Sequence, residues 1–134
     1  AFDMNNLDEL QELEVVLQAI TIASIVAFFL FNTSRVLKAV ELWKECLIIL
    51  NNKALDKNNM IIKLYYEQIC WIVIEGCCRI NDYQTGIKYG RELLALYRQS
   101  GERTKERMVL FKLETLHQRQ GDNVEAKELF EEAL

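Results

Sequence analysis

The chain has 134 residues, a mass of 15.7 kDa and a hydrophobic content of 51%, which excludes a disordered chain and predicts one folded domain or one piece of a longer array. The absence of proline and the presence of only five glycines exclude collagen-like and linker-like sequences. Sixteen basic residues against 20 acidic ones give a net charge of −4, so we do not expect a nucleic-acid ligand.

Helix start and stop signals divide the chain into six helical segments, which pair as three hairpins at about residues 6–51, 57–100 and 102–134. The first helix is predicted to begin at a capping box, Asn6 to Glu9, and to end near Phe31. The second is predicted to begin at a cap, Ser34, and to end near Asn51.

The middle hairpin is predicted from a cap at Asp56, a helix that continues to Ile80, and a second cap at Asp82. Gly101 is the clearest helix stop in the chain, because glycine is favoured just after the last turn. No segment alternates apolar and polar residues between turn dipeptides, so the sequence predicts no strands.

The last hairpin is predicted as a helix over about residues 102–120, followed by a second helix after Gly121. This second helix opens with a D-x-x-E capping box, Asp122 to Glu125, and is still helical in character at Leu134. Together the six segments predict an all-α fold.

An uncharged run of 20 residues, Val15–Ser34, is long enough to cross a bilayer as a helix. Arg35 and Lys38 after it would suit a cytoplasmic flank, whereas the acidic residues before it do not resemble a signal peptide. A polar stripe occupies one face of this helix, at Glu14, Gln18, Thr21 and Ser24. We therefore expect a buried helix of a soluble domain, with a membrane span as the weaker alternative.

The four cysteines lie in apolar stretches and form no C-x-x-C pair: Cys46, Cys70, Cys77 and Cys78. This pattern predicts buried, free thiols in a reducing compartment, and hence a cytoplasmic protein. Neighbouring helical residues point about 100° apart, so of the vicinal pair we expect one thiol in the core and one near the surface.

A small residue followed four positions later by a bulky one recurs in the second helix of the hairpins. The pattern reads Ala126-x3-Phe130-x2-Ala133 in the last hairpin, after the turn Gly121-Asp122-Asn123 and a helix that carries Leu110, Leu113 and His117. It reads Ala39-x3-Trp43-x2-Cys46 in the first hairpin and, more weakly, Gly86-x3-Gly90-x2-Leu93 in the middle one. This pattern resembles the tetratricopeptide repeat (TPR), a helix-turn-helix unit.

The anchors Ala39, Gly86 and Ala126 lie 47 and 40 residues apart, and repeats of this length resemble those of the G-protein signalling modulators and of rapsyn. Glu114 and Ile74 stand where the repeat has a small residue, and no proline closes any repeat. Another α-solenoid, such as a PCI-associated or HEAT-like array, is the alternative.

The resemblance implies three hairpins stacked as a superhelical TPR-like α-solenoid, whose first helices line a concave groove that binds a peptide. Transferred to this sequence, the groove positions are Thr21, Ser24, Phe28, Gln68, Trp71, Glu75, Arg79, Met108, Phe111, Thr115 and Gln118. These positions include one arginine and no lysine, which disfavours the carboxylate clamp that other TPR proteins use for chaperone tails. Aromatic residues and Met108 instead suit an extended or helical peptide with apolar anchors, with Trp71 as the central anchor.

Chemistry is not predicted at any of these positions. His117 is the only histidine and has no second ligand at zinc spacing, so we expect it to pack against the neighbouring helix. Glu75 and Arg79 are expected to form a surface ion pair across one helical turn. No catalytic, cofactor or metal motif is present.

The sequence therefore predicts a non-catalytic adaptor or scaffold that binds a protein or peptide partner. Two alternatives remain: self-association, as a homo-oligomer or within a larger solenoid, through residues 15–31, and a membrane-anchored TPR protein.

Overall fold

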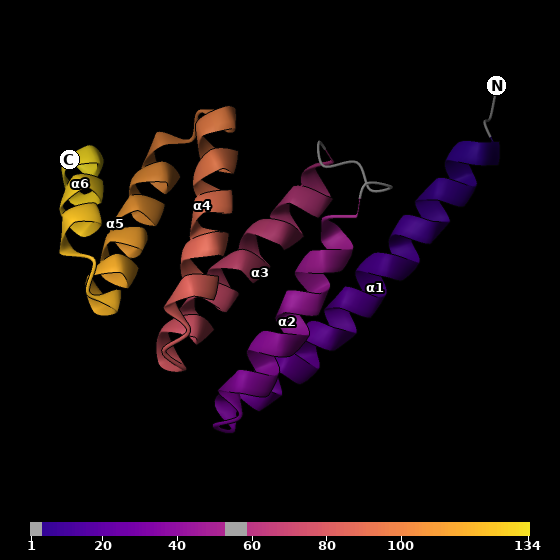
Figure 1. The fold of residues 1–134 in the computed structure, drawn as a ribbon. Coiled ribbons are helices and arrows are strands. Elements are labelled where there is room, and N and C mark those ends of the chain that lie inside the picture. The colour runs from indigo at the N-terminus through magenta and orange to yellow at the C-terminus, as the bar shows by residue number, and fades with distance from the viewer. Residues whose placement is uncertain (1–3, 53–58) are drawn as a thin grey trace. The chain divides into compact units, whose positions relative to one another are not determined.

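The structure, a computed structural model, describes residues 4–52 and 59–134, and all of the regular secondary structure in these ranges is α-helical (Figure 1). The helices are α1 (Met4–Asn32), α2 (Val36–Leu50), α3 (Met60–Arg79), α4 (Tyr83–Ser100), α5 (Arg103–Gln120) and α6 (Asn123–Ala133). The prediction of an all-α fold is therefore confirmed for the described part of the chain.

The chain divides into two compact units. The first, residues 1–64, holds α1, α2 and the beginning of α3, and the second, residues 65–134, holds the remainder of α3 with α4, α5 and α6.

In the first unit, α1 and α2 form an antiparallel hairpin (Figure 1). Trp43 of α2 is fully buried, and its ring meets the rings of Phe28 and Phe31 edge to face, with centroids 5.1 and 5.7 Å apart. Small residues let the backbones approach, because Ala27 of α1 and Ala39 of α2 are both fully buried. The hairpin is thus held by one aromatic cluster and a close helix contact.

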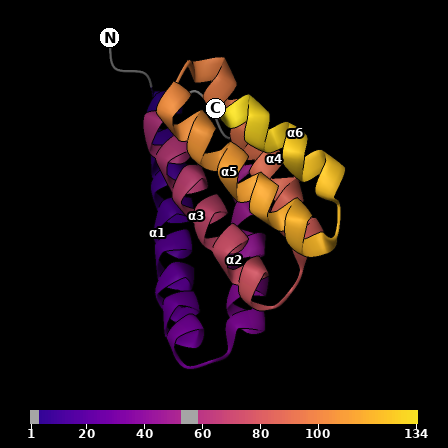
Figure 2. The same ribbon diagram turned by 90° about the vertical axis from the view of Figure 1, so that its left-hand side faces the viewer.

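In the second unit, α3 and α5 lie on one side and α4 and α6 on the other (Figure 2). Its core is drawn from all four helices and is almost entirely apolar. Its buried residues include Ile69, Cys70, Val73, Ile74, Cys77, Ile87, Leu93, Tyr97, Val109, Leu110, Leu113, Leu116, Ala126, Leu129 and Ala133. In each of the four helices the buried residues recur every three or four positions, which places them on the side that faces the other helices.

Two glycines set the distance between α4 and α5. A Cβ atom at Gly90 would lie 2.6 Å from Leu113 Cδ2, and a Cβ atom at Gly86 would lie 3.3 Å from Leu116 Cδ2. The absence of a side chain at both positions lets the leucines of α5 sit against the backbone of α4.

The caps predicted at Asp82 and Asp122 are confirmed. The carboxylates of Asp82 and Asp122 each accept a hydrogen bond, at 3.3 Å, from the backbone N–H three residues later. Gly101 and Gly121 follow α4 and α5 in the left-handed conformation, with φ values of 72° and 91°.

The caps predicted for the first hairpin, at Asn6 and Ser34, are not found. Asn6 lies inside α1, because nothing in residues 4–6 stops the helix from extending in the N-terminal direction. Ser34 has a φ of 66° in the turn, and Arg35 takes the N-cap position of α2, which begins at Val36. The predicted cap Asp56 lies outside the described residues, and Asn59 caps α3 by accepting from the N–H of Ile61 at 2.9 Å.

Candidate functional site

The predicted groove residues of α3 form one stripe along the helix, at intervals of three and four residues. Gln68, Glu75 and Arg79 are exposed, whereas Trp71 is half-buried. The indole Nε1–H of Trp71 donates a hydrogen bond to the hydroxyl of Tyr97 on α4, at 3.0 Å. The polar end of this indole is therefore committed to the α3–α4 hairpin and is not available to a ligand.

The predicted residues of α5 form a second stripe. Met108, Phe111 and Gln118 are exposed, and Thr115 is half-buried with its hydroxyl donated to the carbonyl of Phe111 at 3.0 Å. The Phe111 ring packs against the Phe130 ring of α6, with centroids 6.0 Å apart, and still keeps 41% of its surface exposed. Met108, at 55%, is the most exposed apolar side chain of α5.

Two ion pairs join the stripes of α3 and α5. Lys112 Nζ lies 2.8 Å from Glu75 Oε2, and Lys105 Nζ lies 2.8 Å from Glu67 Oε1. The hydrogen bond from Lys112 lowers the pKa of Glu75 below its usual value, and the hydrogen bond to Glu67 raises the pKa of Lys105. The two ion pairs thus join α3 to α5 along one face of the unit, and Glu75 is the predicted groove residue that takes part in them.

Sequence reasoning missed both lysines. It paired Glu75 with Arg79 along α3, and the structure also gives Glu75 an ion pair with Lys112, 37 residues away. The sequence does place Lys112 one helical turn after Met108. The partner of this lysine depends on which helices are neighbours, and the spacing along one helix does not determine that.

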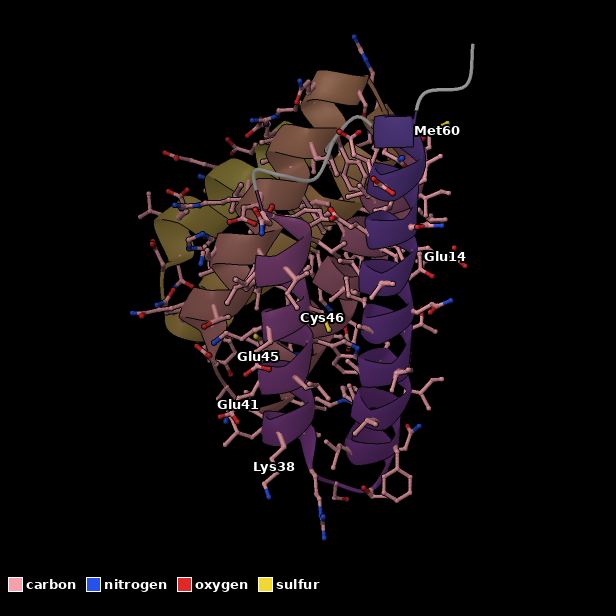
Figure 3. All side chains as sticks on the ribbon, turned by 90° about the vertical axis from the view of Figure 1, so that its right-hand side faces the viewer. Glu14, Lys38, Glu41, Glu45, Cys46 and Met60 are labelled. Carbon is pink, nitrogen blue, oxygen red and sulfur yellow. The ribbon has the colours of Figure 1, made fainter. Side chains whose placement is uncertain are left out.

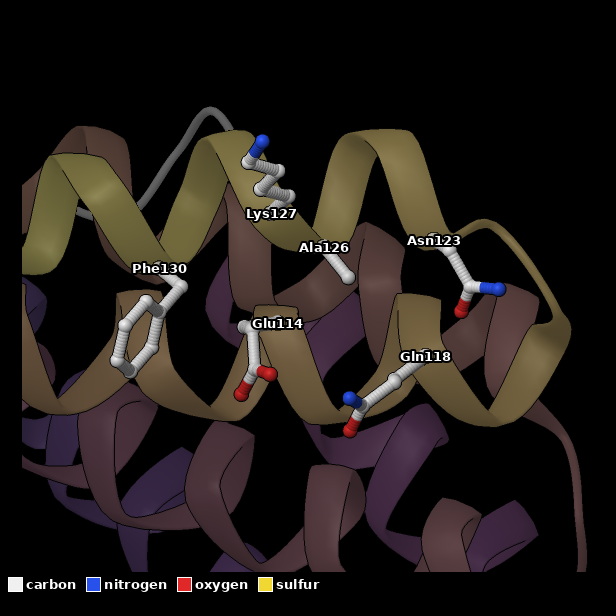
Figure 4. A pocket seen from close by; sticks show the side chains of 6 residues that line it. All are labelled: Glu114, Gln118, Asn123, Ala126, Lys127 and Phe130. Atoms are coloured by element: carbon white, nitrogen blue, oxygen red, sulfur yellow. The ribbon is translucent and has the colours of Figure 1, made fainter.

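A shallow hollow of about 360 Å³ lies beside this face, between α5 and α6 (Figure 4). Its lining residues are Glu114, Gln118, Asn123, Ala126, Lys127 and Phe130. Gln118 is the one predicted groove residue among them, and Figure 4 shows its side chain lying along α5 on the side towards Glu114. Glu114, which stands where the repeat has a small residue, is half-buried at this hollow.

The predicted groove residues of α1 belong to the first unit. Thr21 is exposed and donates its hydroxyl to the carbonyl of Leu17 at 2.8 Å, and Ser24 is half-buried. Phe28 is half exposed, with one edge on Trp43. The structure therefore joins the α3 and α5 sets within one unit, and the α1 set lies in the other.

The buried polar and thiol groups match a packing role. His117 is 5% exposed and neither ring nitrogen has a hydrogen-bond partner, which confirms that it packs inside the second unit. All four cysteines are free and buried, as predicted, and burial raises the pKa of the Cys70 thiol to about 12. Among the described residues, no three side chains of metal-ligand type cluster together.

The expectation for the vicinal cysteines is wrong, because Cys77 and Cys78 are both buried. Cys77 continues the buried stripe of Cys70, Val73 and Ile74 on α3. Cys78 lies three residues after Glu75, on the edge of α3 that Lys112 of α5 approaches, so it is covered as well.

The apolar run on α1 differs most from its prediction. Residues 8–32 have the length and hydropathy of a membrane-spanning helix, and only 11% of the most apolar window is buried. Within the run, Ile20 and Ala27 are buried, whereas Val15, Ile22 and Phe29 are each about two-thirds exposed. The prediction of a buried helix is therefore wrong for these residues, because α2 covers one apolar face of α1 and a second one remains exposed.

No protein-family model matches the chain, and neither a curated protein nor a solved structure matches it.

Proposed function

We propose that the chain is a non-catalytic adaptor or scaffold module, built as a TPR-like helical array, that binds a peptide or protein segment on the α3–α5 face. Met108 carries this proposal, because a large, flexible apolar side chain is 55% exposed one helical turn before Lys112, which pairs with Glu75. Apolar anchors next to fixed charges are typical of surfaces that recognise peptides.

The order of helices in the second unit supports the array. Ion pairs connect α3 to α5 and also α4 to α6, where Arg91 faces Glu125 at 3.7 Å and Arg98 binds Glu132. In stacked helical hairpins the first helices neighbour each other and so do the second helices, which is the pairing that these contacts make.

A cytoplasmic location is part of the same proposal. The four free, buried thiols support it, because they fit a reducing compartment and act as small apolar groups in the two cores.

The test is a selection of peptides from a randomised library on the immobilised chain, followed by affinity measurements with two variants. Met108→Asp should lower the affinity for the selected peptides by about tenfold or more, because it places a charge at the apolar anchor. Val124→Asp is the matched control, since Val124 is an exposed apolar residue of α6. Equal losses in both variants, or no loss in Met108→Asp, would reject the α3–α5 face.

A further inference from the structure

Helix α1 has two apolar seams on opposite faces. The first contains Ile20 and Ala27, packs on α2 and is buried. The second follows a heptad spacing, with Val15, Ile22 and Phe29 seven residues apart and Ile25 three residues after Ile22. We call these four residues, together with Gln18 and Val26, the outer seam.

The outer seam has the pattern of a coiled-coil surface. Its five apolar side chains are between 47% and 65% exposed. They form one continuous exposed row, whereas the exposed apolar residues of an ordinary surface helix are scattered singly. A repeat of 3.5 residues keeps a seam of this kind facing one partner helix along its length.

Charge is distributed unequally along α1. Within α1, four acidic residues and no basic ones precede the seam, at Asp8, Glu9, Glu12 and Glu14. Arg35 in the turn and Lys38 in the first turn of α2 follow its other end. All six charged side chains are exposed. A parallel pair of such helices would place acid beside acid, whereas an antiparallel pair places each acidic end beside the basic turn of the other chain.

We propose that the outer seam binds the same seam of a second copy of this chain, as an antiparallel and two-fold symmetric helix pair. With Ile22 of one copy level with Ile25 of the other, Glu12 comes level with the turn that holds Arg35 of the second copy. The apolar seam supplies the affinity and the exposed charges select the orientation.

A bilayer is the competing occupant, and α2 argues against it. Helix α2 packs alongside α1, and Figure 3 shows Lys38, Glu41 and Glu45 on the side of α2 that faces away from α1. If α1 crossed a membrane with α2 still attached, these charges would lie at the depth of the lipid chains. A second protein helix covers the outer seam without moving α2.

The experiment is sedimentation equilibrium of the full 134-residue chain, without detergent, from about 5 to 200 µM. We expect a concentration-dependent species of twice the 15.7 kDa chain mass. Ile22→Lys should raise the dissociation constant by about tenfold or more. Ile48→Lys on α2 is the matched control, because the two isoleucines are 64% and 66% exposed, and it should leave the dissociation constant unchanged. Circular dichroism should show the same helix content in both variants.

Charge exchange tests the orientation. Glu12→Arg and Arg35→Glu should each weaken the dimer, and the double variant should restore it, because both contacts are rebuilt with opposite signs. If the double variant loses as much dimerisation free energy as the two single variants together, the antiparallel arrangement is wrong. A monomer at all concentrations, or flotation of the chain with phosphatidylcholine vesicles in place of dimerisation, overturns the proposal as a whole.

Discussion

The contact between Gly90 of α4 and Leu113 of α5 gives a direct test of the packing in the second unit. In Gly90→Ala, the new Cβ atom would lie 2.6 Å from Leu113 Cδ2 and 3.2 Å from its Cγ, so the leucine has to move. Leu113 is almost completely buried, which leaves little space for that movement. We expect an overpacking cost of about 1–3 kcal/mol, offset by about 0.5–1 kcal/mol from the better helix propensity of alanine.

The expected net loss of stability is about 1 kcal/mol, which corresponds to a fall of about 0.5 M in the midpoint of urea unfolding. Gly86→Ala is the matched control on the same helix. Its new Cβ atom would lie 3.3 Å from Leu116 Cδ2, so the clash is mild and the change should be within about 0.5 kcal/mol.

A double substitution separates the two contributions. In a Leu113→Ala background the clash is absent, so Gly90→Ala should now stabilise by about 0.5–1 kcal/mol. A Gly90→Ala variant that is as stable as the wild type in the presence of Leu113 would show that α4 and α5 are farther apart than described, and would refute the reasoning.

Three further predictions follow from single contacts. Trp71→Phe removes the N–H donated to Tyr97 and should cost about 1 kcal/mol in urea unfolding; a midpoint equal to that of the wild type would count against the hydrogen bond. Lys112 lowers the pKa of Glu75 below its ordinary 4.5, so the contribution of Glu75 to stability is present above pH 4.5 and is lost as the pH falls below that value. Because the carboxylate is half exposed, this loss should be about 0.5 kcal/mol or less. The loss should be absent from Glu75→Gln when the unfolding midpoint is measured as a function of acid pH. Burial raises the pKa of Cys70 from 9.0 to about 12, so the folded state keeps a proton that the unfolded chain loses and stability should decline as the pH rises above 9; a Cys70→Ala variant with an equally steep alkaline decline would contradict this.

The second half of the chain was the more predictable from sequence, because its signals are local. Asp82, Gly101, Gly121 and Asp122 each determine a helix end through bonds within three to five residues, and such bonds form whatever the helices later pack against. The loop before α3 was harder, since it holds several residues that can cap a helix, and Asn59 is the one the structure uses.

Contacts between helices were less predictable. The pairing of Glu75 with Lys112 depends on the order in which helices stack, and the exposure of Ile22 depends on how many helices cover α1. An apolar run specifies that a surface avoids water but does not specify what covers it. For the same reason, the sequence predicts that Met108 and Phe111 share one stripe of a helix, but it does not predict the hydrogen bond from Trp71 to Tyr97.

The two turns at Gly101 and Gly121 have a consequence for protein chemistry. Both residues have positive φ values, 72° and 91°, which L side chains rarely adopt. An amino acid of opposite handedness prefers this backbone region, so D-alanine fits both turns without strain. Because D-alanine also restricts the unfolded chain, a semisynthetic protein with D-alanine at these two positions should gain about 0.4–1 kcal/mol at each, with every contact between the helices unchanged.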